Sequence, residues 1–248
     1  MRGYAESGVA EAIRQAGGEI FGVTSEPQSL ATEASEGWEL GFPCVGDPHH
    51  EILGACRERG WLDLFVNAGS GLSEFSETRS WIAHPKGYFQ PGVLALTGEG
   101  RVLYRWRCRP TRRNLGGAAE RPTPKYVLAQ VRSRLAGSGA DPSLDASPET
   151  DGRVPPWWLF VLLLLAHGWF LRPKTFPLAR AGDEPSADPR HMLPRVVAFV
   201  GAWIAAFGFL PTGWVALGLV AWAALVWPGV AAVRREFQNV RNDSPDPG

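Results

Sequence analysis

Three cysteines are the side chains best suited to covalent chemistry in this chain of 248 residues. Cys44, Cys56 and Cys108 form no Cys-x-x-Cys pair, and their odd number argues against a disulfide framework or a zinc site. Cys44 ends an apolar run and Cys56 lies in a helical pattern, so each is either a relocated redox thiol or a small buried hydrophobe. Cys108 shares a strand face with apolar residues, which favours a position in the core.

Histidines and arginines offer two other kinds of chemistry. His49, His50 and His84 lie beside turn signals, but a metal site needs a further convergent ligand, so the pattern favours exposed loop histidines. Seven arginines lie between Arg101 and Arg121. Their alternate spacing is typical of the solvated face of a strand and of the loop after it. We therefore expect no metal, no cofactor and no nucleic-acid partner.

Alternating helix and strand patterns over residues 1–136 must position these side chains. Helices are expected over 5–15, from Ser25 and Pro27 onward, over 49–59 with Asp47 as its cap, and over 122–135. Strands are expected over 19–24, 38–45, 94–96 and 102–108, the last two forming a hairpin around Thr97-Gly-Glu-Gly100. This order predicts an α/β fold, with helices on both faces of a sheet and no strand before the first helix.

Several motifs occur in the order typical of one family. The longest are His84-Pro-Lys-Gly-Tyr-Phe-Gln-Pro-Gly-Val-Leu-Ala-Leu96, Arg105-Trp-Arg-Cys-Arg-Pro110 and Asn114-Leu-Gly-Gly-Ala-Ala-Glu-Arg-Pro122, preceded by Val23-Thr-Ser-Glu-Pro27 and Gly46-Asp-Pro48. Together, over about residues 3–136, they resemble the AhpC/TSA-like, peroxiredoxin-like branch of the thioredoxin superfamily. The resemblance implies a thioredoxin-like fold, reduction of peroxides or disulfides through a cysteine thiolate, and a thiol redox partner protein.

The resemblance also shows what this chain lacks. Members of that branch carry a Trp-Cys-x-x-Cys-like motif at the start of the first helix, where the helix dipole lowers the pKa of the thiol. Met1-Arg2-Gly3-Tyr4 occupies the corresponding place, so no motif cysteine is present, and Cys44 is the candidate substitute. Either the true chain extends upstream, or the protein is a degenerate relative. Two functions therefore remain open. The protein is either a redox protein that is inactive in this form, or a non-catalytic binding module.

Five further positions receive roles from the resemblance. Pro91 corresponds to the superfamily's cis-proline, and with Gln90 it would face a bound substrate or a partner thiol. The alternative is a trans proline that opens a strand. Arg109, Asn114 and Arg121 lie in a family-like loop, where they either hold the loop against the domain or line the pocket.

The composition changes after residue 136. Residues 137–156 are rich in Gly, Ser, Asp and Pro, which predicts a flexible linker. Residues 157–172 predict a first transmembrane or interfacial helix, which at about 1.5 Å per residue is short for a bilayer of roughly 30 Å. Residues 196–233 contain no charged side chain and predict a transmembrane helical hairpin broken at Pro211-Thr-Gly213. The protein is thus expected to be integral to a membrane, with lipid as a partner.

Charges around the apolar runs predict their orientation. The basic loop 173–195 and its flank Arg172 carry five Lys and Arg residues, and the polar tail 234–248 carries three Arg residues. Because positively charged loops stay inside, the loop and the tail are expected in the cytoplasm. If 157–172 crosses the bilayer, the N-terminal domain is extracytoplasmic, as we expect. If it does not cross, the domain is cytoplasmic.

Overall fold

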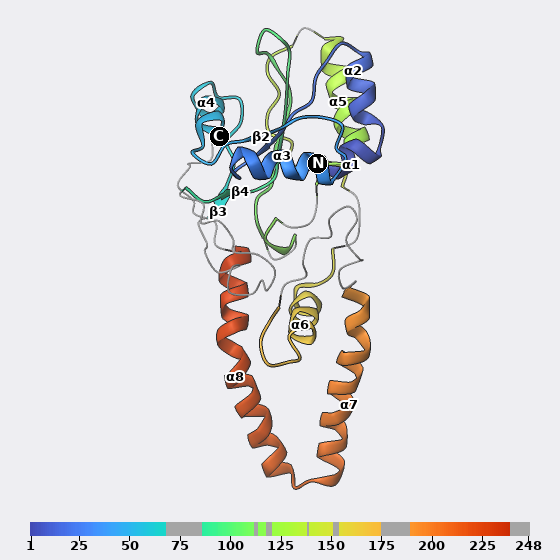
Figure 1. Ribbon diagram of the computed structural model, residues 1–248, viewed down its shortest axis with the longest axis vertical. Helices are drawn as coiled ribbons and strands as arrows, with labels where there is room; N and C mark the ends of the chain where they lie inside the picture. The colour runs from blue at the N-terminus through green and yellow to red at the C-terminus, as the bar shows by residue number, and fades with distance from the viewer. Residues whose placement is uncertain are drawn as a thin grey trace. The chain divides into compact units, whose positions relative to one another are not determined.

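A computed structural model describes residues 1–67, 86–111, 114–117, 121–137, 139–150, 154–174 and 189–238. These residues form two compact units (Figure 1). The N-terminal unit contains the described residues up to Val154, and the C-terminal unit contains those from Pro155 to Gln238.

The N-terminal unit begins with two short helices where the helical pattern predicted one. α1 covers Arg2–Glu6 and α2 covers Val9–Gln15. Gly8 separates them with a φ of 73°, in the left-handed region that glycine adopts without steric cost. The spacing of the apolar residues predicted a helix here, but it did not indicate the break at Gly8.

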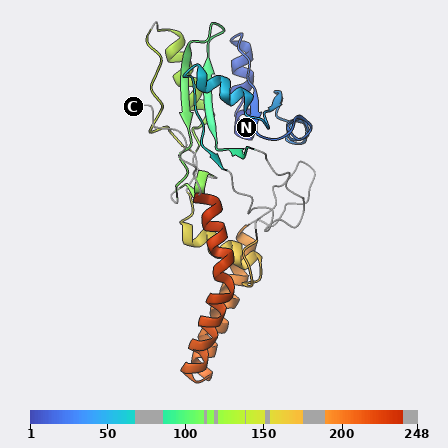
Figure 2. The same cartoon turned by 90° about the vertical axis from the view of Figure 1, so that its left-hand side faces the viewer.

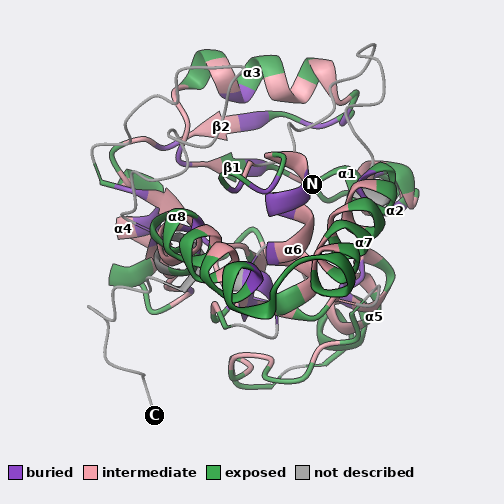
Figure 3. Ribbon diagram, turned by 90° about the horizontal axis from the view of Figure 1, so that it is seen from below, coloured by how far each residue is buried: buried purple, intermediate pink, exposed green. Residues whose placement is uncertain are grey.

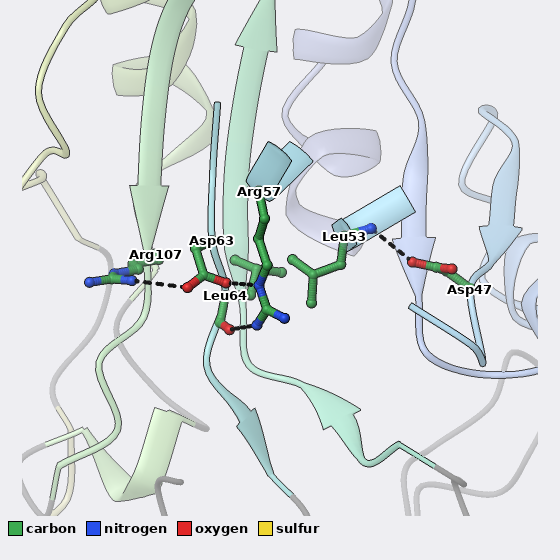
Figure 4. A network of polar contacts seen from close by, with 6 residues as sticks. All are labelled: Asp47, Leu53, Arg57, Asp63, Leu64 and Arg107. Atoms are coloured by element: carbon green, nitrogen blue, oxygen red, sulfur yellow. Dashed lines mark hydrogen bonds and ion pairs between the residues drawn. The ribbon is translucent and has the colours of Figure 1, made fainter. Parts of the chain in front are cut away.

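The next two helices were predicted, and their first turns differ in how they are capped. α3 covers Gln28–Gly37 after Pro27, so Ser25 is not the cap; its hydroxyl instead accepts the N–H of Phe89 at 3.3 Å. α4 covers Glu51–Glu58. The N-cap residue of α4 is His50, but the predicted role of Asp47 at this helix start is borne out, because its carboxylate accepts the N–H groups of Glu51 at 2.6 Å and Leu53 at 3.1 Å; Figure 4 shows the bond to Leu53.

The strands form three ladders of two strands each. β1 (Gly22–Thr24) pairs in parallel with β2 (Cys44–Gly46), and β3 (Val66–Asn67) pairs antiparallel with β4 (Tyr88–Phe89). β5 (Gly92–Leu96) and β6 (Val102–Arg107) form the predicted hairpin, the long green pair in Figure 2. The mixture of helices with parallel and antiparallel strands confirms an α/β fold. The described strands are not joined into the single sheet that we predicted.

Two apolar clusters hold the N-terminal unit together. In the first, α5 (Pro124–Leu135) packs its Val127 against the buried face of β6, which consists as predicted of Val102, Tyr104, Trp106 and Cys108. In the second, Ala10 of α2 and Ala31 of α3 meet Cys44 of β2, together with Leu40 and Phe42. Figure 3 shows buried segments on β1 and β2, while α3 is mostly exposed or half-buried.

The segment predicted to be a flexible linker is instead a strap, residues 139–150, that lies along β6. The Asp141 carboxylate accepts the N–H of Val102 at 3.2 Å, and the N–H of Asp145 donates to the carbonyl of Arg105 at 3.0 Å. The Asp145 carboxylate also accepts the hydroxyls of Tyr104 and Tyr126, both at 2.9 Å. Burial and this carboxylate raise the pKa of Tyr104. Gly, Pro and Asp disfavour helix and strand in this segment, but they do not prevent fixed contacts with β6. The N-terminal domain therefore extends beyond residue 136, where we predicted its end.

The described part of the C-terminal unit has three α-helices and one short 3-10 helix, Pro189–Met192. α6 covers Trp157–His167, and the predicted hairpin is formed by α7 (Leu193–Phe209) and α8 (Thr212–Gln238), with the turn at Leu210 and Pro211. The stretch 212–234 of α8 has 23 residues and a mean hydropathy of 1.9, which is long and apolar enough to cross a membrane. Among the described residues, α6 and α7 are shorter apolar helices.

α6 packs against the open end of this hairpin. Leu165 and Ala166 join a buried cluster with Met192 and Val226, and the ring of Phe170 stacks on that of Phe199 with centroids 3.8 Å apart. The chain then turns back at once, because the N–H of Lys174 donates to the carbonyl of Leu164 at 2.9 Å. A helix of 11 residues rises about 16 Å, roughly half the hydrocarbon thickness. The first of the two predictions for 157–172, a transmembrane helix, is not supported.

The strap gives a direct test of how the N-terminal unit is closed. Asp145→Ala removes the acceptor shared by two phenols, so we expect the free energy of unfolding to fall by about 1–3 kcal/mol. The strap should also become the first site of limited proteolysis. Urea unfolding of the full chain in detergent and mass spectrometry of early fragments measure both effects. Ser143→Ala, an exposed change in the same segment, is the matched control; equal behaviour of the two variants would contradict the role of Asp145.

Candidate functional site

The Cys108 thiol lies at the centre of the polar cluster nearest to the predicted site. Cys108 follows β6 and is 1% exposed. Its N–H donates to the carbonyl of Pro91 at 2.8 Å, which extends the β5–β6 ladder by one pair. Residues from before β5 and after β6 therefore meet at this end of the hairpin.

Asn114 fixes the loop that follows β6. Its side-chain oxygen accepts the N–H groups of Thr111 at 2.8 Å and Gly117 at 3.0 Å. Its amide nitrogen donates to the carbonyl of Arg109 at 2.9 Å and lies 3.7 Å from the sulfur of Cys108. Of the two roles left open for this residue, holding the loop against the domain is therefore the one that its contacts support.

Gln90 and Gly117 pack against each other beside the same thiol. Gly117 has a φ of 91°, and a Cβ added there would lie 2.2 Å from the side-chain oxygen of Gln90 and 3.2 Å from the sulfur of Cys108. Gln90 is buried, and its N–H donates to the carbonyl of Phe65 at 2.8 Å. The Gln90 side chain thus faces the interior of this cluster, and glycine is required opposite it.

The two arginines of the family-like loop differ in position. Arg109 is exposed and contributes its backbone carbonyl to Asn114. The Arg121 residue is exposed as a whole, yet burial of its guanidinium lowers the pKa of that group, and the nearby Cys108 thiol acts in the opposite direction. The structure therefore brings Gln90 and Asn114 together around Cys108. The sequence pattern marked that cysteine only as part of the core.

The peptide bond before Pro91 is not cis, because no cis peptide bond occurs among the described residues. The prediction of a cis-proline rested on the resemblance alone and was wrong. The alternative interpretation describes the observed state: Pro91 opens β5 as a trans residue and needs no N–H of its own at that position.

The other two cysteines differ in exposure, because Cys44 is buried and Cys56 is half-buried. Cys44 is buried in the second cluster, with its sulfur 3.7 Å from that of Met1, and burial raises the pKa of its thiol despite a hydrogen bond with Ser35. Burial also raises the pKa of Cys56, with Arg59 opposing the shift. None of the three cysteines forms a disulfide. Neither Cys44 nor Cys56 has the lowered pKa that a reactive thiol needs at neutral pH.

The arginine face of the hairpin is less solvated than we predicted. Arg105 donates to the carbonyl of Gly60 at 2.8 Å, and the guanidinium of Arg107 lies 4.8 Å from the centre of the Phe65 ring. Asp63 forms ion pairs with Arg57 and, at 3.9 Å, with Arg107 (Figure 4). These arginines hold residues 60–65 against β6, a contact at long sequence separation that the alternate spacing could not show.

The histidines take structural positions where they are described. His50 has one ring nitrogen 3.0 Å from the carbonyl of Gly87, and its ring lies 4.7 Å from that of Phe89. The carbonyl of His49 accepts from Lys86 at 2.6 Å. Within the described ranges, no group of three His, Cys, Asp or Glu residues could hold a metal ion. His84 lies outside those ranges.

Comparisons of this chain with family models, with curated proteins and with solved structures gave no match. The thioredoxin-like resemblance therefore rests on the motifs themselves, and function has to be argued from the geometry.

The contact between Gln90 and Gly117 can be measured as a coupling free energy in a double-mutant cycle. Gly117→Ala should lower the free energy of unfolding by about 2–4 kcal/mol, because it adds a steric conflict to left-handed strain. Gly8→Ala, with a similar φ of 73° and no atom within 4 Å of an added Cβ, should lose only about 1 kcal/mol. Adding Gln90→Ala should restore stability in the Gly117→Ala variant by more than about 0.5 kcal/mol. Strict additivity of the two substitutions would show that the side chains do not meet.

Proposed function

We propose that this protein is a membrane-anchored, thioredoxin-like protein of the peroxiredoxin-like, thiol-redox class, and that this 248-residue chain does not itself turn over peroxide. The family part of the proposal rests on the motifs. The pairing of strands supports it: a parallel ladder whose strands are connected through α3 is followed by an antiparallel hairpin and a closing helix, α5. Gln90 and Pro91 lead into that hairpin, as the resemblance requires.

The expected lack of turnover rests on the state of the thiols. Peroxide reduction begins when a cysteine thiolate attacks one peroxide oxygen, so that the O–O bond breaks, the sulfur becomes a sulfenic acid and water or an alcohol leaves. That step requires an accessible thiolate. Cys108 is buried, and burial raises the pKa of both Cys44 and Cys56. The burial and raised pKa of the thiols are the observation on which the expected lack of peroxide turnover rests.

A second candidate function is a binding module on the same scaffold. In it, the N-terminal unit recognises a partner at the membrane and performs no chemistry. The Asn114 side chain beside Cys108 favours this alternative, because its hydrogen bonds to backbone groups lie within the loop that it fixes. It is therefore suited to rigidity more than to catalysis.

Membrane anchorage is the third part of the proposal. α8 is long enough to span, and the apolar side chains of the turn end of the hairpin are exposed, as lipid contact requires; they include Ile204, Phe209, Trp214, Leu217 and Val220. α7 would complete a hairpin whose open end carries the loop and the tail. Because α6 is too short to span, the N-terminal unit belongs on the same side as that loop. On this proposal the N-terminal unit faces the cytoplasm, which is the alternative that we gave for a segment 157–172 that does not cross the bilayer.

The thiol argument predicts an assay result. Purified full-length protein, supplied with dithiothreitol or thioredoxin and its reductase, should consume hydrogen peroxide no faster than its Cys44→Ser, Cys56→Ser and Cys108→Ser variants. Peroxide consumption well above that background, lost in one of these variants, would identify a working thiol. It would overturn the claim that this chain lacks turnover.

The topology argument predicts protease sensitivity. In right-side-out vesicles that contain the full chain, the N-terminal unit should resist proteinase K, and in inverted vesicles it should be digested. Permeabilised vesicles, in which both sides are accessible, provide the control. Digestion of the unit in sealed right-side-out vesicles would restore the extracytoplasmic alternative and require α6 to cross the bilayer.

A further inference from the structure

The turn after α6 holds a tryptophan and an arginine against each other at the surface of the C-terminal unit. The chain leaves α6 through Trp169 and Phe170, whose φ values of 57° and 58° lie in the left-handed region that residues with a side chain rarely adopt. Phe170 is 6% exposed, whereas Trp169 is 67% exposed. The guanidinium of Arg195, in α7, lies 4.0 Å from the centre of the Trp169 ring. The strained turn thus buries one ring and presents the other to a cation.

The contacts of Arg195 within the unit leave most of its donors available. One terminal nitrogen lies 3.5 Å from the carbonyl of Ala166 and 3.7 Å from the sulfur of Met192. A guanidinium carries five N–H groups in a planar fork. Arg195 is half-buried and forms no ion pair with any described carboxylate, because the described side chains of this unit include no Asp or Glu. The remaining N–H groups of the fork can therefore receive an anion from outside the protein.

Two further basic residues follow the same turn. Arg172 and Lys174 lie where the chain folds back on α6: the N–H of Lys174 donates to the carbonyl of Leu164 at 2.9 Å, and a ring nitrogen of His167 lies 3.3 Å from the carbonyl of Lys174. Among the described residues, the charge at this end of α6 is thus positive, as an anion requires.

The position of Arg195 along the hairpin indicates where that anion lies. Arg195 directly precedes the stretch 196–233, which contains no charged residue, and Arg234 directly follows it. Both arginines therefore mark the open end of the hairpin, where α6 packs between α7 and α8 (Figure 1). In the membrane anchor proposed above, this end lies at the level of the lipid headgroups, where exposed tryptophan and arginine side chains are typically found. Lipid phosphates lie at the same level.

We propose that Arg195, supported by the ring of Trp169, binds the phosphate of an anionic phospholipid in the leaflet at the open end of the hairpin. A planar guanidinium matches the oxygens of a phosphate through two parallel hydrogen bonds, and an aromatic ring beneath it fixes the orientation of the fork. A zwitterionic lipid brings its own cation to the site, so an anionic headgroup is favoured. This inference rests on the proposed membrane anchorage and adds the class of lipid that the anchor selects.

Native mass spectrometry of the full-length protein in detergent tests the inference. The probes are phosphatidylglycerol and phosphatidylcholine with the same acyl chains. We expect the protein to bind phosphatidylglycerol more tightly, and Arg195→Gln to weaken that binding by about fivefold, with little effect on phosphatidylcholine. Arg234→Gln is the matched control, because it removes the same charge at the same boundary and leaves the pair of Arg195 and Trp169 intact. Equal affinity for the two lipids, or equal losses in the two variants, would overturn the proposal.

A second variant keeps the test decisive if Arg195→Gln fails to fold. Trp169→Gly removes the exposed ring, and glycine adopts the left-handed φ of this position without steric cost. It should lower the preference for phosphatidylglycerol, and an unchanged preference would contradict the proposal. Displacement of the lipid by millimolar inorganic phosphate would show that free phosphate, and not a headgroup, is the ligand.

Anchorage itself is checked separately by carbonate extraction of membranes that contain the full chain. Release of the protein by carbonate would refute the anchor and, with it, the headgroup site. Retention of the protein together with equal binding of both lipids would refute the headgroup site alone.

Discussion

The hydrogen bonds along the outer edge of β6 are the constraint on which the N-terminal unit most depends. A hairpin of two strands is marginal in water, and β5–β6 becomes stable because a helix packs on one face and the strap pairs with one edge. Asp145 joins all of these parts, since its carboxylate accepts a phenol from β6 and another from α5 while its N–H donates to Arg105. The hairpin in turn carries Pro91 and Cys108 side by side at its open end.

This arrangement accounts for the burial of the thiol at the centre of the predicted site. The loop after β6 can approach β5 only because Asn114 satisfies three backbone groups within it. The price is that the thiol at its centre is closed off from solvent. The same residues that a redox site would use to orient a substrate here stabilise a turn.

The sequence predicted those elements whose periodicity is local. The alternation of Val102, Tyr104, Trp106 and Cys108 located the hairpin and its core face, and Asp47 located the start of α4. Positions that depend on distant partners were not predictable: the strap looked like a linker because its contacts join it to residues some 20 to 40 positions earlier. The arginine face was misjudged because residues 60–65 cover it. Cys108 became the centre of the site only once Gln90 and Asn114 were seen beside it.

The central claim is that the thiols of this chain are parts of its core and not nucleophiles. The pH dependence of iodoacetamide alkylation, followed separately for Cys44, Cys56 and Cys108 by mass spectrometry of the full-length native protein, tests it most directly. The account predicts that Cys44 and Cys56 ionise above the usual thiol pKa of about 8.5, and that Cys108 reacts only after unfolding. Rapid alkylation of any of the three in the folded protein, with an apparent pKa below about 7, would contradict it.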